Sequence, residues 1–227
     1  MYKHELIFIS GPMGAGKTTF STALFNIMVR KGHKACYRSF TAFSLFSYAF
    51  FKALVILLYG LKIVKYHENV RIHPSTLFIL RVKKLPKLII VLLTLLESLN
   101  MILSFYLKVI LACTGRRVLI VDEGFPNMIA NYIEIFGKNS AFLIALIIAF
   151  VLKLQQRFRL LIIYVDATDS VLLERWTARG HPAPTPVVNI VHHLKYMRLI
   201  RFSKTMFSVI APLVEIYSAQ KYACGQN

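Results

Sequence analysis

The chain has 227 residues, a formal net charge of +18 and 56% hydrophobic residues. This length suits a single domain, 1–227, with a real core, and no repeat or Gly/Ser-rich linker divides it. Nucleic acid is disfavoured as a partner, because basic nucleic-acid binders usually carry polar rather than apolar residues and no zinc-ligand spacing or RNA-recognition signature is present. Positive charge combined with apolar residues instead favours an anionic membrane surface or a very apolar interface.

The amino terminus and the cysteines predict a cytoplasmic protein. The first apolar run, Leu6 to Ile9, is shorter than the core of a signal peptide. Cys36, Cys113 and Cys224 are odd in number, far apart and without CxxC spacing. This pattern is typical of reduced, buried thiols rather than of a disulfide framework or a metal site.

Strands and helices alternate along the chain. Leu6 to Ile9 reads as a strand, and Thr18 to Arg30 has the apolar spacing of a helix. Further strands are predicted at Ala35–Phe40, Arg117–Val121, Leu160–Val165 and, more weakly, Val214–Tyr217. The alternation predicts an α/β fold whose five-stranded, mostly parallel sheet is covered by helices on both faces, with ligands at the carboxyl ends of the strands.

A glycine-rich loop between the first strand and the first helix fits the phosphate-binding pattern G-x-x-x-x-G-K-[ST]. Its residues are Gly11, Pro12, Met13, Gly14, Ala15, Gly16, Lys17 and Thr18. In such a loop the backbone amides face phosphate oxygens, Lys17 reaches the β and γ phosphates, and the Thr18 hydroxyl ligates Mg²⁺. We therefore predict the P-loop NTPase fold with ATP and Mg²⁺ as cofactors, and Thr19 as a further nucleotide contact.

Two acidic residues follow the third predicted strand. Its apolar run ends in Asp122 and Glu123, and a buried strand beside the P-loop would deliver Asp122 to Mg²⁺, usually through water. Apolar runs that end in aspartate are common, so an exposed acidic turn is the alternative interpretation.

A basic segment follows the fourth strand. Arg175 and Arg179 are four residues apart on one predicted helix face, so both can reach one anion. Pro182, Pro184 and Pro186 then break the helix and predict a stiff lid at about 175–190. The alternative is a solvated basic helix face.

These motifs resemble those of the thymidylate kinase and nucleoside-monophosphate kinase group of P-loop kinases. The resemblance covers Phe8–Arg38, Gly115–Asn127 and Leu161–Gly180, in the order of that family. It implies ATP as the donor, Mg²⁺, and a lid arginine that meets the phosphates. The matching positions are Lys17, Thr18, Asp122, Arg175 and Arg179, with Arg38 where such kinases often carry a substrate-contacting arginine.

The chain departs from the family where the acceptor would bind. Thymidylate kinases typically have Asp-Arg-Tyr after the third strand, whereas Glu123 follows Asp122 here, and Asn100 stands near another common arginine position. The family's Arg-Glu-Pro after the second strand is reduced to Arg38, Ser39 and Phe40. Because Glu123 would repel a phosphate-bearing acceptor, a neutral alcohol fits it better, with Asp122 or Glu123 accepting the proton. A kinase for a nucleotide-like acceptor, a membrane-associated kinase for an apolar polyprenyl-type alcohol, and an NTP-binding module or NTPase without acceptor all stay open.

Apolar stretches fill the predicted helical insertion at about 41–113. Phe43–Leu61 and Leu88–Leu111 each predict a helix with a narrow polar stripe and a broad apolar arc. A spanning hairpin is disfavoured because its outer connector, from Lys62 to Lys87, would be strongly basic. Ala141–Leu152 is too short for an ordinary span and predicts a core helix. The arcs therefore indicate a core and homodimer interface, contact with the inner membrane surface, or a pocket for an apolar acceptor.

Overall fold

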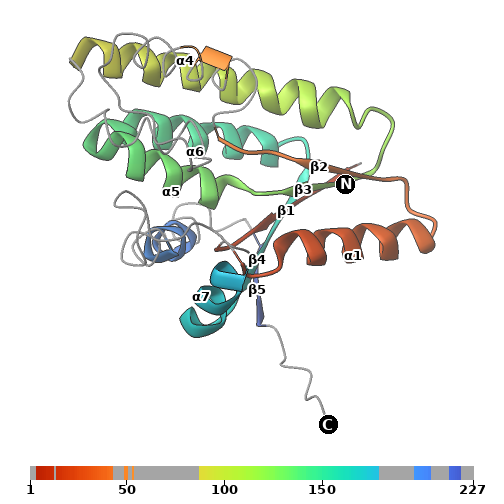
Figure 1. Cartoon of the computed structure of the whole chain (residues 1–227). Helices are drawn as coiled ribbons and strands as arrows, with labels where there is room; N and C mark the ends of the chain where they lie inside the picture. The colour runs from red at the N-terminus through yellow and green to blue at the C-terminus, as the bar shows by residue number, and fades with distance from the viewer. Residues whose placement is uncertain are drawn as a thin grey trace.

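A parallel five-stranded sheet forms the centre of the fold (Figure 1). The computed structural model describes residues 4–12, 14–42, 49–50, 53, 87–178, 197–205 and 215–220, without the side chains of 87–90, 135, 176 and 215–220. The strand order is β2-β3-β1-β4-β5, and all four neighbouring pairs are parallel. The strands are β1 (Glu5–Ser10), β2 (Ala35–Ser39), β3 (Val118–Asp122), β4 (Arg159–Asp166) and β5 (Glu215–Gln220). The predicted α/β fold with five strands is confirmed.

Helices cover both faces of the sheet. Figure 1 shows α4, α5 and α6 in a layer on one side and α1 on the other. Residues 197–205 are also helical. The remaining elements are α1 (Lys17–Arg30), α4 (Lys87–Phe105), the π-helix η1 (Tyr106–Leu111), α5 (Phe125–Phe136), the 3₁₀-helix η2 (Gly137–Ser140), α6 (Ala141–Gln155) and α7 (Asp169–Ala178).

Alternation along β1 divides the core in two. Leu6 and Phe8 join the cluster under α4, α5 and α6, while Ile7 and Ile9 join the cluster under α1. Successive side chains of a strand point to opposite faces, so a strand covered on both sides must be apolar throughout. This is the physical reason why the strands were recognisable as continuous apolar runs.

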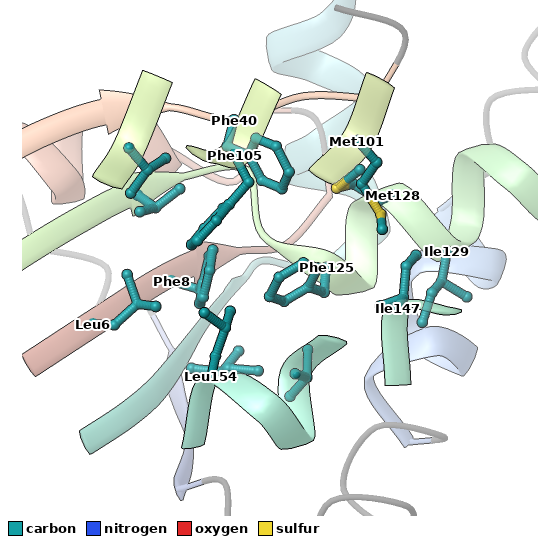
Figure 2. Packing of buried hydrophobic residues seen from close by; sticks show 14 of the residues in the cluster. Leu6, Phe8, Phe40, Met101, Phe105, Phe125, Met128, Ile129, Ile147 and Leu154 are labelled. Atoms are coloured by element: carbon teal, nitrogen blue, oxygen red, sulfur yellow. The ribbon is translucent and has the colours of Figure 1, made fainter. Parts of the chain in front are cut away.

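Aromatic rings fill the cluster under α4, α5 and α6 (Figure 2). The ring centroids of Phe8 and Phe125 are 4.6 Å apart, and Phe105 lies 5.2 Å from both Phe40 and Phe150. These distances are typical of favourable aromatic pairs, and the pairs join β1, α4, α5 and α6. The helical layer is therefore fixed to the sheet through Phe105.

A glycine allows the chain to leave β3 close to β1. A Cβ added at Gly124 would lie 2.9 Å from the Cβ of Phe8, and its φ of −91° is ordinary. Space rather than backbone conformation therefore requires glycine here. The close approach brings the start of α5 against β1.

Two cysteines form a disulfide, so the expectation of three reduced thiols was wrong for this pair. Cys36 on β2 is bonded to Cys113, which follows η1, and their Cα atoms are 5.7 Å apart. The 77-residue separation in sequence conceals this proximity, which arises because β2 and β3 are neighbours in the sheet. Cys224 lies outside the described residues.

Two helical segments in the described part of the chain are long and apolar enough to cross a membrane, judged by length and composition alone. They are Val91–Leu111 and Gly137–Gln155. The second is longer than the run predicted at Ala141–Leu152, because η2 leads directly into α6. Most of the apolar stretch Phe43–Leu61 and residues 179–190 of the predicted lid lie outside the described residues.

Neighbouring aromatic residues provide a test of this packing. Phe105 is 1% exposed, whereas Tyr106 is 54% exposed. Phe105→Ala should lower the free energy of unfolding by about 3–5 kcal/mol, because it leaves a cavity among four aromatic rings. Tyr106→Ala should cost less than about 1 kcal/mol. Urea denaturation of both variants measures the difference, and equal losses would contradict the described packing.

Candidate active site

Pairing of β1 with β3 sets the position of the candidate site. Ile9 lies opposite Asp122 in the parallel register, so the loop after β1 and the end of β3 meet at the same edge of the sheet. β2 adds Ser39 opposite Asp122 on the other side. The predicted P-loop and the predicted acidic residues are therefore neighbours, although more than 100 residues separate them in sequence.

The loop after β1 has the backbone of a phosphate cradle. Gly11 has a φ of 140°, and a Cβ there would lie 1.9 Å from the carbonyl oxygen of Val165, so no other residue fits without a shift of the backbone. Gly16 is the N-cap of α1, whose first turn holds no acidic residue. Lys17 is 9% exposed, and its Nζ donates to the carbonyl oxygen of Pro12 at 3.0 Å. The buried ammonium thus lies at the N-terminus of α1, where a helix favours an anion.

Asp122 is the centre of the polar contacts beside the loop. Its Oδ2 accepts from the Thr18 hydroxyl and from the Tyr37 hydroxyl, both at 3.0 Å. Its Oδ1 accepts from the backbone amide of Glu123 at 3.1 Å. Asp122 is only 5% exposed, so these contacts hold the carboxylate in one orientation towards the P-loop.

Burial and charge shift two pKa values around Asp122. Burial, followed by the hydrogen bond to Asp122, raises the pKa of Tyr37 to about 12, so the phenol stays protonated and donates. Burial also raises the pKa of Glu123, and the nearby Asp122 adds to the increase while Lys17 opposes it. Glu123 has a φ of 62°, an uncommon conformation for a residue with a Cβ and one that is enriched at functional sites.

Asn127 on α5 fixes the first residue of the loop. Its Oδ1 accepts from the Gly11 amide at 3.1 Å and from the Ser10 hydroxyl, and its Nδ2 donates to the Gly11 carbonyl at 2.9 Å. The side chain is 5% exposed. It therefore satisfies both backbone groups of Gly11 in a place that is closed to water.

The remaining predicted nucleotide contacts are Arg175, Ala15, Thr19, Met13 and Arg179. Arg175 donates from Nη1 to the carbonyl oxygen of Gly14 at 3.0 Å, so α7 lies against the loop. Ala15 is buried within the loop, and Thr19 is exposed. Met13 and Arg179 lie outside the described residues.

Two of the three predicted acceptor contacts, Arg38 and Asn100, lie on β2 and α4. Arg38 is exposed on β2, and its Nη1 donates to the carbonyl oxygen of Tyr37 at 3.3 Å. Asn100 is buried on α4, within 3.4 Å of Glu97 Oε2 and of the Ser104 hydroxyl. Both of these partners of Asn100 lie on α4 itself.

Sequence reasoning missed three residues that hold this edge of the sheet. Tyr37 and Asn127 belong to no motif, and only the sheet order and the start of α5 reveal them. Arg201 donates to both carboxylate oxygens of Asp166, to Asp169 Oδ1 at 2.6 Å and to the carbonyl oxygen of Ala167, and so ties residues 197–205 to the end of β4. Each of these residues is recognised by its neighbours in space and not by a sequence motif.

No protein-family model matches this sequence, and neither does any curated protein sequence. Among solved structures, the thymidylate kinase from Ehrlichia chaffeensis is similar to this chain at 12% sequence identity and a TM-score of 0.48. The alignment covers 96% of this chain and 91% of that one. This similarity is too distant to assign a function, so any functional assignment depends on the residues of the site itself.

Removal of the Asn127 side chain tests the clamp on Gly11. Asn127→Ala leaves a buried amide and a buried carbonyl without their described partners, which should lower the free energy of unfolding by about 2–5 kcal/mol. Asn139 is exposed on η2, and Asn139→Ala is the matched control, with an expected change within about 0.5 kcal/mol. Chemical denaturation compares them. A neutral Asn127→Ala would show that the clamp contributes nothing to stability.

Proposed function

We propose that this protein is a P-loop kinase that transfers the γ-phosphoryl group of ATP to a hydroxyl-bearing acceptor. The hydrogen bond of 3.0 Å between Thr18 and Asp122 carries the proposal. It brings together the two oxygen ligands that P-loop phosphotransferases use for Mg²⁺, beside a buried lysine and a glycine-rich cradle. A glycine-rich turn without function would not need an aligned, buried carboxylate.

The donor set fits ATP and Mg²⁺. A hydroxyl and a carboxylate are hard oxygen ligands, and Mg²⁺ is usually bound by one or two carboxylates plus substrate phosphates rather than by an all-protein cage. Bound there, the ion would neutralise charge on the phosphates. Among the described residues no group of three or more His, Cys, Asp or Glu could hold a metal by itself, which is consistent with a site that the nucleotide completes.

The charged side chains of the protein would divide the work of transfer. Lys17 would leave the carbonyl of Pro12 for the phosphates, and Arg175 would do the same from Gly14, so both would stabilise negative charge on the transferred group. Asn127 and Tyr37 would act as positioning residues, because they hold the loop backbone and the Asp122 carboxylate in place.

We infer that the acceptor presents a neutral hydroxyl rather than a phosphate near Asp122. Lys17 and Asp122 are close enough to Glu123 to shift the pKa of its carboxyl group. Two carboxyl groups, those of Asp122 and Glu123, would therefore flank the position where the acceptor meets the donor. Within the described ranges, the cations near this point, Lys17 and Arg175, contact the P-loop itself. Arg38 is the described cation available for a more distant acceptor group.

Substitution of Lys17 tests the kinase assignment. Lys17→Ala should reduce acceptor-dependent ADP formation by at least about a hundredfold, because it removes a preorganised charge from the transferred phosphate. Lys31→Ala, at the exposed C-cap of α1, is the matched control and should retain activity. Undiminished turnover in folded Lys17→Ala would refute the assignment. ADP formation by the wild type that does not increase with any acceptor would favour an NTPase.

A panel of acceptors tests the role of Glu123. Thymidine monophosphate should be a poor substrate compared with nucleosides or polyprenyl alcohols. Loss of one charge-assisted phosphate contact costs about 1.5–3 kcal/mol, so two such losses and a nearby carboxylate would reduce binding by several powers of ten. Steady-state ATP consumption with one enzyme preparation makes the comparison. Efficient thymidylate phosphorylation would contradict a neutral acceptor.

A further inference from the structure

The helix α4 has its polar side buried and its apolar side exposed. Thr94, Glu97, Ser98, Asn100 and Ser104 are at most 6% exposed. The opposite side carries large hydrophobic side chains that are 39–69% exposed: Val91, Leu92, Leu95, Leu99, Ile102 and Leu103. A surface helix in water normally buries its apolar side and exposes its polar side, which is the opposite of what α4 does. The exposed side of α4 is therefore suited to contact with an apolar partner.

The exposed apolar surface continues beyond α4. Tyr106, Leu107 and Leu111 extend it along η1 at 40–54% exposure. The neighbouring helix α6 adds Phe142 and Leu152 at 51% and 45%, and it contacts α4 through the ring pair Phe105–Phe150. We call the exposed hydrophobic side chains of α4, η1 and α6 the apolar face. Between Val91 and Leu111 the charged residues are Glu97, which is buried, and Lys108, which is half-buried.

Basic residues border this face where the strands begin. Arg116 and Arg117 follow η1 and precede β3. Lys153, in the last turn of α6, and Arg157, just after that helix, precede β4, and all four residues are exposed. Parallel strands begin at the same edge of a sheet, so the two pairs lie at the same end of the helical layer. Lys138 is exposed on η2, at the other end of α6. The described acid at this edge, Glu5, is 3.4 Å from Arg159 and is therefore already paired.

We propose that the apolar face and its basic border bind an anionic lipid surface, with α4 lying in the plane of the membrane. Exposed hydrophobic side chains would enter the boundary between headgroups and acyl chains, and the arginines and lysines would contact anionic headgroups. This proposal stands independently of the proposed kinase activity, because the apolar face is formed by α4, η1 and α6, whereas the P-loop, Asp122 and Glu123 lie after β1 and at the end of β3.

The other side of α4 argues against a membrane-spanning role. Leu93, Met101 and Phe105 belong to the core cluster that includes residues of β1, as does Val109 of η1. Tyr132 of α5 donates to Glu97 at 2.7 Å. A spanning α4 would have to leave the sheet and break these contacts. In-plane binding keeps them and covers only the side that is exposed.

Charge argues against a second copy as the occupant. Each chain has a formal net charge of +18, and stacking two apolar faces would bring two basic borders together. Like charges across an interface are unfavourable, whereas an anionic surface neutralises them. Anionic lipid therefore satisfies both the apolar face and its border.

Co-sedimentation of the full chain with vesicles tests the proposal. Vesicles of phosphatidylcholine and phosphatidylserine should bind the protein at least about tenfold more tightly than phosphatidylcholine alone, and moderate salt should weaken this preference. Arg116→Gln/Arg117→Gln should weaken binding to the anionic vesicles by about 25-fold, at roughly fivefold per residue. The proposal would be overturned if the wild-type protein did not bind anionic vesicles, or bound both kinds of vesicle equally well.

Two charge-matched double variants separate the apolar face from net charge. Leu95→Glu/Leu99→Glu places carboxylates in the face, whereas Ile27→Glu/Val29→Glu places them on α1, where the native residues are 49% and 48% exposed. The first variant should lose at least about tenfold in vesicle affinity. The affinity of the second variant should fall less, because only the lower net charge of the protein weakens its binding. Equal losses would overturn the role of the face.

Two further readouts keep the result unambiguous. Circular dichroism and thermal denaturation show whether each variant is folded. Sedimentation velocity without vesicles shows whether the protein is a dimer. If the wild type is a dimer that does not bind vesicles, and Leu95→Glu/Leu99→Glu dissociates this dimer, the apolar face is an interface with a second copy instead. A kinase assay that fails while vesicle binding persists would refute the proposed function and leave this inference intact.

Discussion

Parallel pairing between β1 and β3 is the constraint on which the candidate site depends. It carries the P-loop and Asp122 to one edge of the sheet and brings Thr18 within 3.0 Å of the carboxylate. Gly11 must pass against Val165 of the strand on the other side, and Asn127 closes the loop from α5. The site is thus held by three neighbouring elements rather than by the loop alone, which preorganises it for a charged ligand.

The helical layer serves two different requirements with its two sides. Its inner side must cover the sheet, and Phe105 does so through contacts with Phe8, Phe40, Phe125 and Phe150. Its outer side carries exposed hydrophobic side chains along α4 and α6, a surface of the kind that marks an interaction site. Buried hydrogen bonds among Glu97, Tyr132 and Asn100 fix the rotation of α4, so the same polar stripe that stabilises the layer also directs the apolar face outwards.

The proposed acceptor chemistry and the apolar face are compatible but do not depend on each other. Two carboxyl groups beside the P-loop favour a neutral hydroxyl, and the apolar face favours lipid. An acceptor dissolved in the membrane would satisfy both. The disulfide between Cys36 and Cys113 ties β2 to the end of η1, and so fixes the end of the apolar face next to the strand that carries Tyr37.

Sequence alone determined the strands, the P-loop and the candidate Mg²⁺ ligands. Strands buried on both faces are continuous apolar runs, and the P-loop is a local motif whose glycines, lysine and threonine are consecutive, so neither requires knowledge of distant contacts. Only the tertiary structure decided that Cys36 pairs with Cys113, that Tyr37 and Asn127 support the site, and that the polar stripe of α4 points inwards. Each of these depends on which elements become neighbours in space, and a helix with one polar and one apolar side has the same sequence pattern whichever side faces the core.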